Sequence, residues 1–297
     1  MWLKAELAKF IKKASECMYR ILVTGAKSYI GTSFENHLKR WSVDYQVDTV
    51  DMIDGSWRHK DFHGYDSVFH VAGIAHQKET SENASSYYSV NRDLAVETAK
   101  KAKADGVPHF VFLSSMSVYG LDTGVITRDI QPCPTTNYGK SKWEAEQLLQ
   151  ELADNSFGIA VLRPPMVYGK NCRGNFQSLV CFARKFSFFP KVSNQRSMIF
   201  IDHLCEFVRQ LIERRALGVF FPQNQEYMQT SQMVQWMGEA LGRKISLSKM
   251  LGLGVKCLYP FSRTIRKAFG TLIYKDCGAD DFSYCIDTPE NSVKQSI

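Results

Sequence analysis

The chain has 297 residues, of which 44% are hydrophobic and 23% charged, and these values argue against a disordered protein. No apolar run reaches the ~18 residues that a membrane-spanning helix needs. The formal net charge of +7 suits an anionic ligand such as a diphosphate. No zinc-ligand spacing, RNA-recognition motif or long basic block indicates nucleic acid as a partner.

Residues 1–17 predict a separate amphipathic extension, in which four lysines interrupt apolar residues at helical spacing. The segment lacks the apolar centre of a signal peptide. We expect it to pack on its own domain, with contact to a membrane surface as the alternative. The eight cysteines are scattered without a CxxC pair, which predicts reduced thiols in a soluble, cytoplasmic protein that holds no metal.

From residue 18 onward, short apolar strands alternate with helices. The strands are expected at 19–24, 45–51, 67–72, 109–113 and 159–162, and the helices at 31–41, 86–104 and 138–152. This alternation predicts an α/β protein with a Rossmann-type, doubly wound parallel sheet.

The pattern changes after Gly169. Residues 171–194 are irregular and aromatic, and a further strand and helix are expected over 198–202 and 203–214. Thr230 or Ser231 can cap a helix that ends near Leu241. A second apolar helix is expected over 246–269, with a break near Pro260.

A glycine motif, Thr24-Gly25-Ala26-Lys27-Ser28-Tyr29-Ile30-Gly31, lies between the first predicted strand and helix. Gly25 permits a tight turn, Gly31 permits close packing, and the helix N-terminus offers N–H groups to a pyrophosphate. An ordinary strand-to-helix turn is the alternative interpretation. An acid at the end of the second strand would bind a ribose and favour NAD over NADP. Asp51 fits this position, with Asp48 and Asp54 as rivals.

Three further side chains suggest proton transfer. Tyr138 and Lys142 are one helical turn apart and share a face. A phenol with a pKa near ~10 is a poor base, but a neighbouring ammonium and a nicotinamide cation stabilise its ionised form. Ser115 follows the strand 109–113, at the sheet edge where open parallel sheets bind ligands. Its hydroxyl can therefore hydrogen-bond a reacting oxygen beside the tyrosine.

With these motifs the sequence resembles the extended short-chain dehydrogenase/reductase family, specifically its NAD-dependent nucleotide-sugar epimerases, dehydratases and reductases. The resemblance covers about residues 19–213, and its motifs are TGAKSYIG, HVAGIAH, SSMSVYG, YGKSK, LRPPMVYG and RSMIFIDHL. It implies that Tyr138 is the general acid and base, that Lys142 is its partner and that Ser115 is the hydroxyl donor.

The resemblance also implies the binding residues. The cofactor, NAD with NADP as the alternative, would contact Gly25, Ser28, Tyr29, Ile30, Gly31, Asp51, Ala72, Gly73, Tyr138 and Lys142. The substrate would contact His76, Ser117, Asn175 and Arg196. Asn91 matches a position that supports the site. A surface salt bridge is the alternative for Arg196, and an ordinary loop histidine for His76.

The same resemblance implies the domain organisation. Residues 18–169 plus 195–220 would form the dinucleotide-binding domain. Residues 170–194 plus 221–297 would form a smaller C-terminal lobe that binds the nucleotide sugar. A homodimer is expected through the helices 86–104 and 138–152.

The sequence departs from the family pattern at several places. Ser28 replaces the middle glycine of the motif, and Met166 stands where relatives often carry a substrate-binding asparagine. The motif Ser115-Met116-Ser117 lacks the Asp-Glu pair of 4,6-dehydratases, which argues against that reaction. Only a short loop fits between Asp51 and Asp66, which predicts a trimmed sheet edge and an adenine pocket open on one side.

The leading hypothesis is NAD(P)-dependent oxidoreduction at C4 of a nucleotide diphosphate sugar, UDP-linked, in the synthesis of polysaccharide or glycan precursors. A 4-epimerase and a 4-ketoreductase share this apparatus, and the sequence leaves both open. A hypothesis of another class is a non-catalytic protein that senses a dinucleotide on the same fold.

Overall fold

The computed structural model of the chain describes residues 18–41, 43–75, 77–277 and 281–297. The predictions made for residues 1–17 and for His76 therefore lie outside the described residues.

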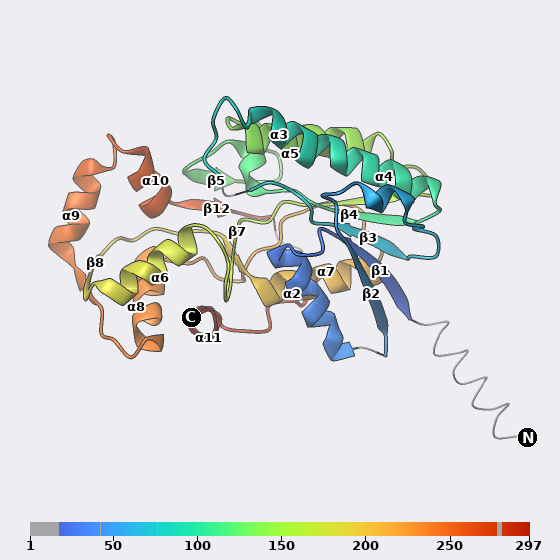
Figure 1. Cartoon of the computed structure of the whole chain (residues 1–297). Helices are drawn as coiled ribbons and strands as arrows, with labels where there is room; N and C mark the ends of the chain where they lie inside the picture. Colours follow the sequence, from blue (N-terminus) through green and yellow to red (C-terminus); the bar gives the residue numbers. More distant parts are fainter. Residues whose placement is uncertain (1–17, 42, 76, 278–280) are drawn as a thin grey trace, which may run out of the picture.

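Six parallel strands form the central sheet (Figure 1). They are β1 (Tyr19–Thr24), β2 (Tyr45–Val50), β3 (Ser67–His70), β4 (His109–Leu113), β6 (Gly158–Leu162) and β10 (Gly218–Phe220), in the spatial order β10-β6-β4-β3-β1-β2. The chain runs from β1 outward to β2 and then crosses back to β3 on the other side of β1. The direction of winding reverses there, which is where open α/β sheets bind ligands. The predicted Rossmann-type sheet is confirmed.

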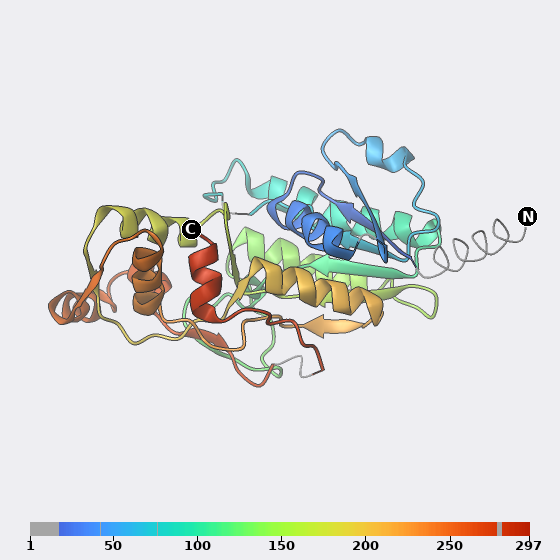
Figure 2. The same cartoon turned by 90° about the horizontal axis from the view of Figure 1, so that it is seen from below.

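Helices cover both faces of this sheet (Figures 1 and 2). One face carries α2 (Tyr29–Leu38) and α7 (Ile201–Glu213), and the other carries α3 (Ala84–Tyr88), α4 (Leu94–Ala104) and α5 (Asn137–Gln150). Successive strand residues point to opposite faces. Accordingly Ile21 and Val23 pack in one apolar cluster with the first pair of helices, and Leu22 packs in another with α4 and α5.

The sheet edge is trimmed, as the sequence predicted. β2 is the edge strand, and residues 51–66 contribute only a short 3₁₀ turn, Ser56–His59. Trp57 and Phe62 from this segment are buried against the α4 side of the sheet. The segment is therefore packed rather than loose, and the openness of the adenine pocket stays a prediction.

The structure corrects several predicted elements. Residues 171–194 were expected to be irregular, which is wrong, because they contain α6 (Asn175–Lys185) and β8 (Phe188–Pro190). The helix expected over 86–104 is interrupted by a π-helical turn, Ser89–Asp93, between α3 and α4. The apolar stretch 246–269 forms β11 (Ser246–Ser248), α9 (Lys249–Leu258) and α10 (Arg263–Phe269), with the predicted break at Pro260.

The predicted cap of α8 (Thr230–Ala240) is also wrong. The helix begins after Gln229, and neither hydroxyl caps it. Thr230 donates to the carbonyl of Ala268 at 3.2 Å, and Ser231 donates to that of Pro190 at 2.9 Å. The two hydroxyls therefore make tertiary contacts, to α10 and to β8, instead of capping their own helix.

Three parallel two-stranded ladders connect the remaining segments. They pair β5 (Gly124–Ile126) with β12 (Leu272–Tyr274), β7 (Met166–Tyr168) with β9 (Met198–Phe200), and β8 with β11. α11 (Pro289–Gln295) packs on α8. The β5–β12 ladder attaches the C-terminal segment to the loop that follows β4, beside the carboxyl edge of the sheet.

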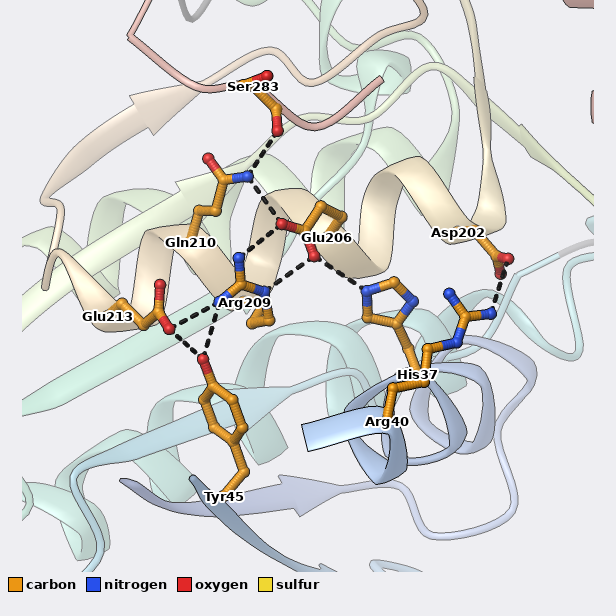
Figure 3. Close-up of polar contacts among 9 residues, drawn as sticks. All are labelled: His37, Arg40, Tyr45, Asp202, Glu206, Arg209, Gln210, Glu213 and Ser283. Atoms are coloured by element: carbon orange, nitrogen blue, oxygen red, sulfur yellow. Dashed lines mark hydrogen bonds and ion pairs between the residues drawn. The ribbon is translucent and has the colours of Figure 1, made fainter. Parts of the chain in front are cut away.

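A polar network joins α2, β2 and α7 on the face opposite α5 (Figure 3). The Glu206 carboxylate accepts from His37 at 3.1 Å, from Arg209 at 2.6 Å and from Gln210 at 2.8 Å. Arg209 also pairs with Glu213 at 2.7 Å. Although burial alone would raise the pKa of Glu206, these donors hold it well below its usual range.

Candidate active site

The first turn of α5 positions Tyr138. Thr136 caps the helix by accepting from the N–H of Gly139 at 3.1 Å. The Glu79 carboxylate accepts from the N–H groups of Asn137 and Tyr138, at 3.1 Å each. A carboxylate at this end of a helix is stabilised by the exposed N–H groups. Sequence reasoning missed Glu79, because a loop acid far from the helix in sequence carries no local signal.

The structure brings the Tyr138 phenol and the Ser115 hydroxyl together. Their hydrogen bond lowers the pKa of Tyr138, but burial raises it more, so the net shift is upward. The Tyr87 ring packs edge-on against the Tyr138 ring, with centroids 6.4 Å apart. The Ser115 oxygen also accepts from the N–H of Ser117 at 3.1 Å, which fixes the hydroxyl at the end of β4.

Lys142 reaches the same edge of the sheet from one turn further along α5. Its buried ammonium donates to the carbonyl of Leu113, the last residue of β4, at 2.8 Å. Burial lowers the pKa of Lys142 to about 7, while the charge of Glu146 acts to raise it. The sequence predicted that this ammonium, together with a bound nicotinamide cation, would lower the pKa of Tyr138. Lys142 is not among the groups that shift this pKa in the described structure, where burial raises it. The lowering in the cofactor-bound site stays a prediction.

A buried polar network beneath Lys142 was not predicted. The Glu146 carboxylate pairs with Arg163 at 2.6 Å and accepts a short hydrogen bond from Ser114. Arg163 also donates to the Tyr119 hydroxyl at 2.7 Å. A sequence signal did exist, since Glu146 follows Lys142 by four residues and so shares its helix face. The network ties α5 to the strand ends that carry the site.

The turn after β1 approaches β3 without intervening side chains. Gly25 has φ +96°, and a Cβ there would lie 3.1 Å from the backbone of Ala72. A Cβ on Gly31 would lie 3.1 Å from the Gly25 carbonyl oxygen and 2.7 Å from the Ser28 hydroxyl. The two glycines therefore allow a cradle of bare backbone at the switch point of the sheet, the shape that a pyrophosphate needs.

The start of α2 supplies N–H groups to this cradle. Ser28 was expected to contact the cofactor, but its hydroxyl caps α2 by accepting from the N–H of Gly31 at 3.1 Å. The N–H groups of Tyr29 and Ile30 belong to the first turn and have no intrahelical acceptor. The Tyr29 hydroxyl points elsewhere, into a buried position close to Gly169. The backbone of this turn fits a bound pyrophosphate.

Gly73 and Asn91 bring the end of β3 against Lys142. A Cβ on Gly73 would lie 2.9 Å from the Asn91 amide oxygen and 3.3 Å from the Lys142 ammonium. Asn91 is buried, accepts from the N–H of Ile74 at 2.8 Å and donates to Ser141 at 3.2 Å. It lies in the π-helical turn, a local irregularity frequent at functional sites.

The three candidate ribose acids have different partners. Asp51 directly follows β2 and accepts from the N–H of Ile53 at 3.0 Å. Asp48 accepts from the Tyr65 hydroxyl at 2.7 Å, within the packing of the sheet edge. Asp54 accepts from Ser56 in an exposed turn. Asp51 alone stands at the carboxyl end of the strand, so it stays the predicted ribose partner.

The predicted substrate residues are dispersed. Ser117 lies beside Ser115, with the two hydroxyl oxygens 3.2 Å apart. Arg196 donates to the Gly270 carbonyl at 3.0 Å, and burial lowers its pKa. This backbone partner argues against the alternative of a surface salt bridge. Asn175 is exposed at the first residue of α6, and no contact within the described chain joins it to Tyr138.

Comparison with known proteins finds similar sequences among 4-epimerases that act on sugars and in a subunit of methionine adenosyltransferase. The chain is 27% identical to N-acetyl-alpha-D-glucosaminyl-diphospho-ditrans,octacis-undecaprenol 4-epimerase of Escherichia coli O157:H7, over 76% of this chain and 73% of the relative. It is 33% identical to UDP-glucose 4-epimerase of Vibrio cholerae, over 59% of this chain and 57% of the relative. It is 26% identical to methionine adenosyltransferase 2 subunit beta of Pongo abelii, over 78% and 77%.

Solved structures share the fold. UDP-glucuronic acid 4-epimerase of Bacillus cereus, in complex with NAD, superposes with a TM-score of 0.71 at 18% identity, covering 93% of this chain and 97% of that one. The dTDP-4-dehydrorhamnose reductase of Bacillus anthracis, in complex with NADP, gives 0.71 at 16% identity, covering 94% and 98%. The family model described as NAD dependent epimerase/dehydratase family matches residues 21–221. With the parallel sheet and the glycine cradle described above, this match shows that the chain belongs to the NAD dependent epimerase/dehydratase family, as its motifs predicted.

Proposed function

We propose that this chain catalyses NAD(P)-dependent oxidation and reduction at C4 of a sugar carried on a nucleotide diphosphate, with UDP as the nucleotide. The observation that carries the proposal is the contact between the Ser115 and Tyr138 hydroxyls, beside the Lys142 ammonium and the Gly73 backbone. These groups surround the carboxyl ends of β3 and β4, next to the cradle for a pyrophosphate.

The protein groups divide the proton transfer among them. Tyr138 removes the proton of the C4 hydroxyl in the oxidising direction and returns a proton to the carbonyl oxygen in the reducing direction. Ser115 hydrogen-bonds the same oxygen, and Lys142 places a positive charge beside the phenol. A bound nicotinamide would provide the hydride chemistry. The backbone of Gly25 to Gly31 would hold its pyrophosphate, and Asp51 would hold the adenine ribose.

One incubation separates the two reactions that share this apparatus. A 4-epimerase converts a UDP-hexose into its C4 epimer without added cofactor, because the hydride returns to the same sugar. A 4-ketoreductase turns over only when both NAD(P)H and a 4-keto sugar are added. We expect one of these results, and Tyr138→Phe should reduce the turnover about 10²-fold or more. Undiminished turnover in that variant would refute the role given to Tyr138.

The name of one relative supports a second carrier for the sugar. The Escherichia coli relative is named for a sugar linked through a diphosphate to undecaprenol instead of a nucleoside. Both carriers present a diphosphate, which Arg196 suits as a guanidinium beside the substrate lobe. Parallel assays with UDP-N-acetylglucosamine and with a polyprenyl diphosphate N-acetylglucosamine decide between them.

A non-catalytic dinucleotide sensor is the candidate of another class, and the subunit-type relative supports it. A sensor would bind NAD but give no sugar turnover with either carrier, and Tyr138→Phe would leave its binding unchanged. The homodimer through α4 and α5 and the cytoplasmic location stay predictions. Light scattering of the purified protein tests the former, and cell fractionation tests the latter.

A further inference from the structure

The end of the molecule formed by α9 and α10 exposes an unusual amount of apolar surface. Among the described residues, fifteen large apolar side chains are exposed, and seven of them lie at this end. They are Phe186, Phe188, Met250, Leu251, Leu253, Leu258 and Phe261, and together we call them the apolar tip. Met250 is 85% exposed and Phe261 87% exposed. Figure 1 shows α9 at the extreme end of the molecule, away from the central sheet.

α9 contributes almost nothing to the protein core. Of its ten residues only Gly252 is buried, and a Cβ there would meet the Lys191 carbonyl oxygen at 2.3 Å. The helix therefore packs on the end of β8 through one glycine and leaves its side chains outside. Met250, Gly254 and Leu258 follow at four-residue spacing and share a face. A helix that buries no large apolar residue needs a partner for that face.

The chain segment that forms α9 and α10 carries only positive charges. No aspartate or glutamate occurs between Glu239 and Asp276. This segment contains eight basic residues: Arg243, Lys244, Lys249, Lys256, Arg263, Arg266, Lys267 and Lys275. The segment therefore carries +8, while the rest of the chain sums to −1. Arg263 and Lys267 contact Asp122, and Lys249 and Lys256 are exposed beside the apolar face of α9.

We propose that the apolar tip binds the surface of an anionic lipid bilayer. An exposed apolar helix face with flanking lysines is the pattern of helices that lie in the membrane interface. A second copy of the chain is a poorer partner, because its tip carries the same positive charge. Residues 1–17 are also net positive and do not complement the tip. No helix among the described residues is long and apolar enough to cross a bilayer, so the contact is peripheral.

This surface differs from the membrane contact considered from the sequence. That alternative concerned residues 1–17, whereas the tip belongs to the segment that was expected to bind the sugar. α10 ends at Phe269, and the carbonyl of the next residue, Gly270, accepts from Arg196, the predicted phosphate contact. Docking through the tip would therefore hold the substrate side of the molecule near the lipid surface.

Vesicle co-sedimentation tests the proposal with the full chain. We expect binding to phosphatidylcholine vesicles that contain phosphatidylglycerol, weaker binding to pure phosphatidylcholine, and a decrease with salt. Met250→Asp combined with Phe261→Asp should weaken the binding about 100-fold, since each side chain loses its apolar burial. Lys249→Gln and Lys256→Gln should each weaken binding to the anionic vesicles about fivefold. The control is Val43→Asp, which changes a side chain 76% exposed outside the tip and should bind like the parent.

Several results would overturn the proposal. The parent protein could fail to bind anionic vesicles, or the aspartate and the glutamine variants could all bind as strongly as the parent. Light scattering could also show that the tip mediates self-association while no vesicles are bound. Thermal melts check folding, and we expect these surface variants to melt with the parent because each substituted side chain is exposed. Tyr138→Phe should bind vesicles like the parent. Vesicle binding without sugar turnover would thus reject the proposed function alone, and turnover without vesicle binding would reject this inference alone.

Discussion

Replacing Glu146 with glutamine should both destabilise the protein and shift its pH profile. The Glu146 carboxylate and the Arg163 guanidinium form a buried pair, with side chains 4% and 8% exposed. The substitution removes the negative charge and leaves the arginine in the interior without its counterion. It also removes the charge that raises the pKa of Lys142.

The structure sets the size of the expected effect. Breaking a buried ion pair on one side costs ~3–5 kcal/mol. Glutamine keeps one acceptor oxygen for Arg163 and Ser114, so we expect the lower value of about 3 kcal/mol. For a chain of this size that loss lowers the Tm by about 6–12 °C. Without Glu146 the pKa of Lys142 falls below about 7, so the ammonium loses its proton at lower pH.

The assays are thermal unfolding and the pH dependence of kcat/KM, measured with the sugar substrate that the incubations above select. The alkaline limb of the Glu146→Gln profile should move to lower pH, because the working form of Lys142 is charged. The matched control is Glu144→Gln, on the same helix, whose carboxylate pairs with Arg92 at 39% and 30% exposure. Such a pair contributes only ~0–1 kcal/mol. If Glu146→Gln melts with the control and keeps the parent's alkaline limb, the reasoning about this network is wrong.

Three further outcomes are expected. Gly25→Ala forces φ +96° on a residue with a Cβ and puts that atom 3.1 Å from the Ala72 backbone, so the free energy of unfolding should fall by more than ~1 kcal/mol. Calorimetric titration of this variant should also show weaker NAD binding. An unchanged affinity for NAD would contradict the role of the glycine cradle. Lys142→Met should reduce turnover ~100-fold or more and should raise the stability of the fold. In the parent the pKa of Lys142 is about 7 when folded, which is below its value in the unfolded chain. The parent should therefore gain stability as the pH rises above 7, and the variant should not. The pKa of Glu206 in the folded chain lies well below its unfolded value of ~4.3, so its contribution to stability is present above pH ~4.3 and is lost as the pH falls. Denaturant titrations should therefore show a larger loss of unfolding free energy in acid for the parent than for Glu206→Gln. Equal losses would mean that Glu206 is not the cause.

Much of the fold could be predicted because its signals are local. The alternation of apolar strands with helices, the turn at Gly25 and the spacing of Tyr138 and Lys142 each depend on residues close together in the chain. Steric limits on φ, the two strand faces and the helical repeat act over that short range. The short segment between Asp51 and Asp66 predicted the trimmed edge for the same reason, since too few residues remain for another strand.

The supporting residues of the site were decided by tertiary structure. Glu79 caps α5 from a distant loop, and Arg163 meets Glu146 only after β6 pairs with β4. The hydroxyls of Thr230 and Ser231 donate to carbonyls of α10 and β8 instead of capping their own helix, because those carbonyls come within reach only in the folded chain. Amino-acid order thus determined which residues could form the turn and the helix face. Folding decided how deeply each charge is buried and which group it meets, because both depend on contacts between segments far apart in sequence.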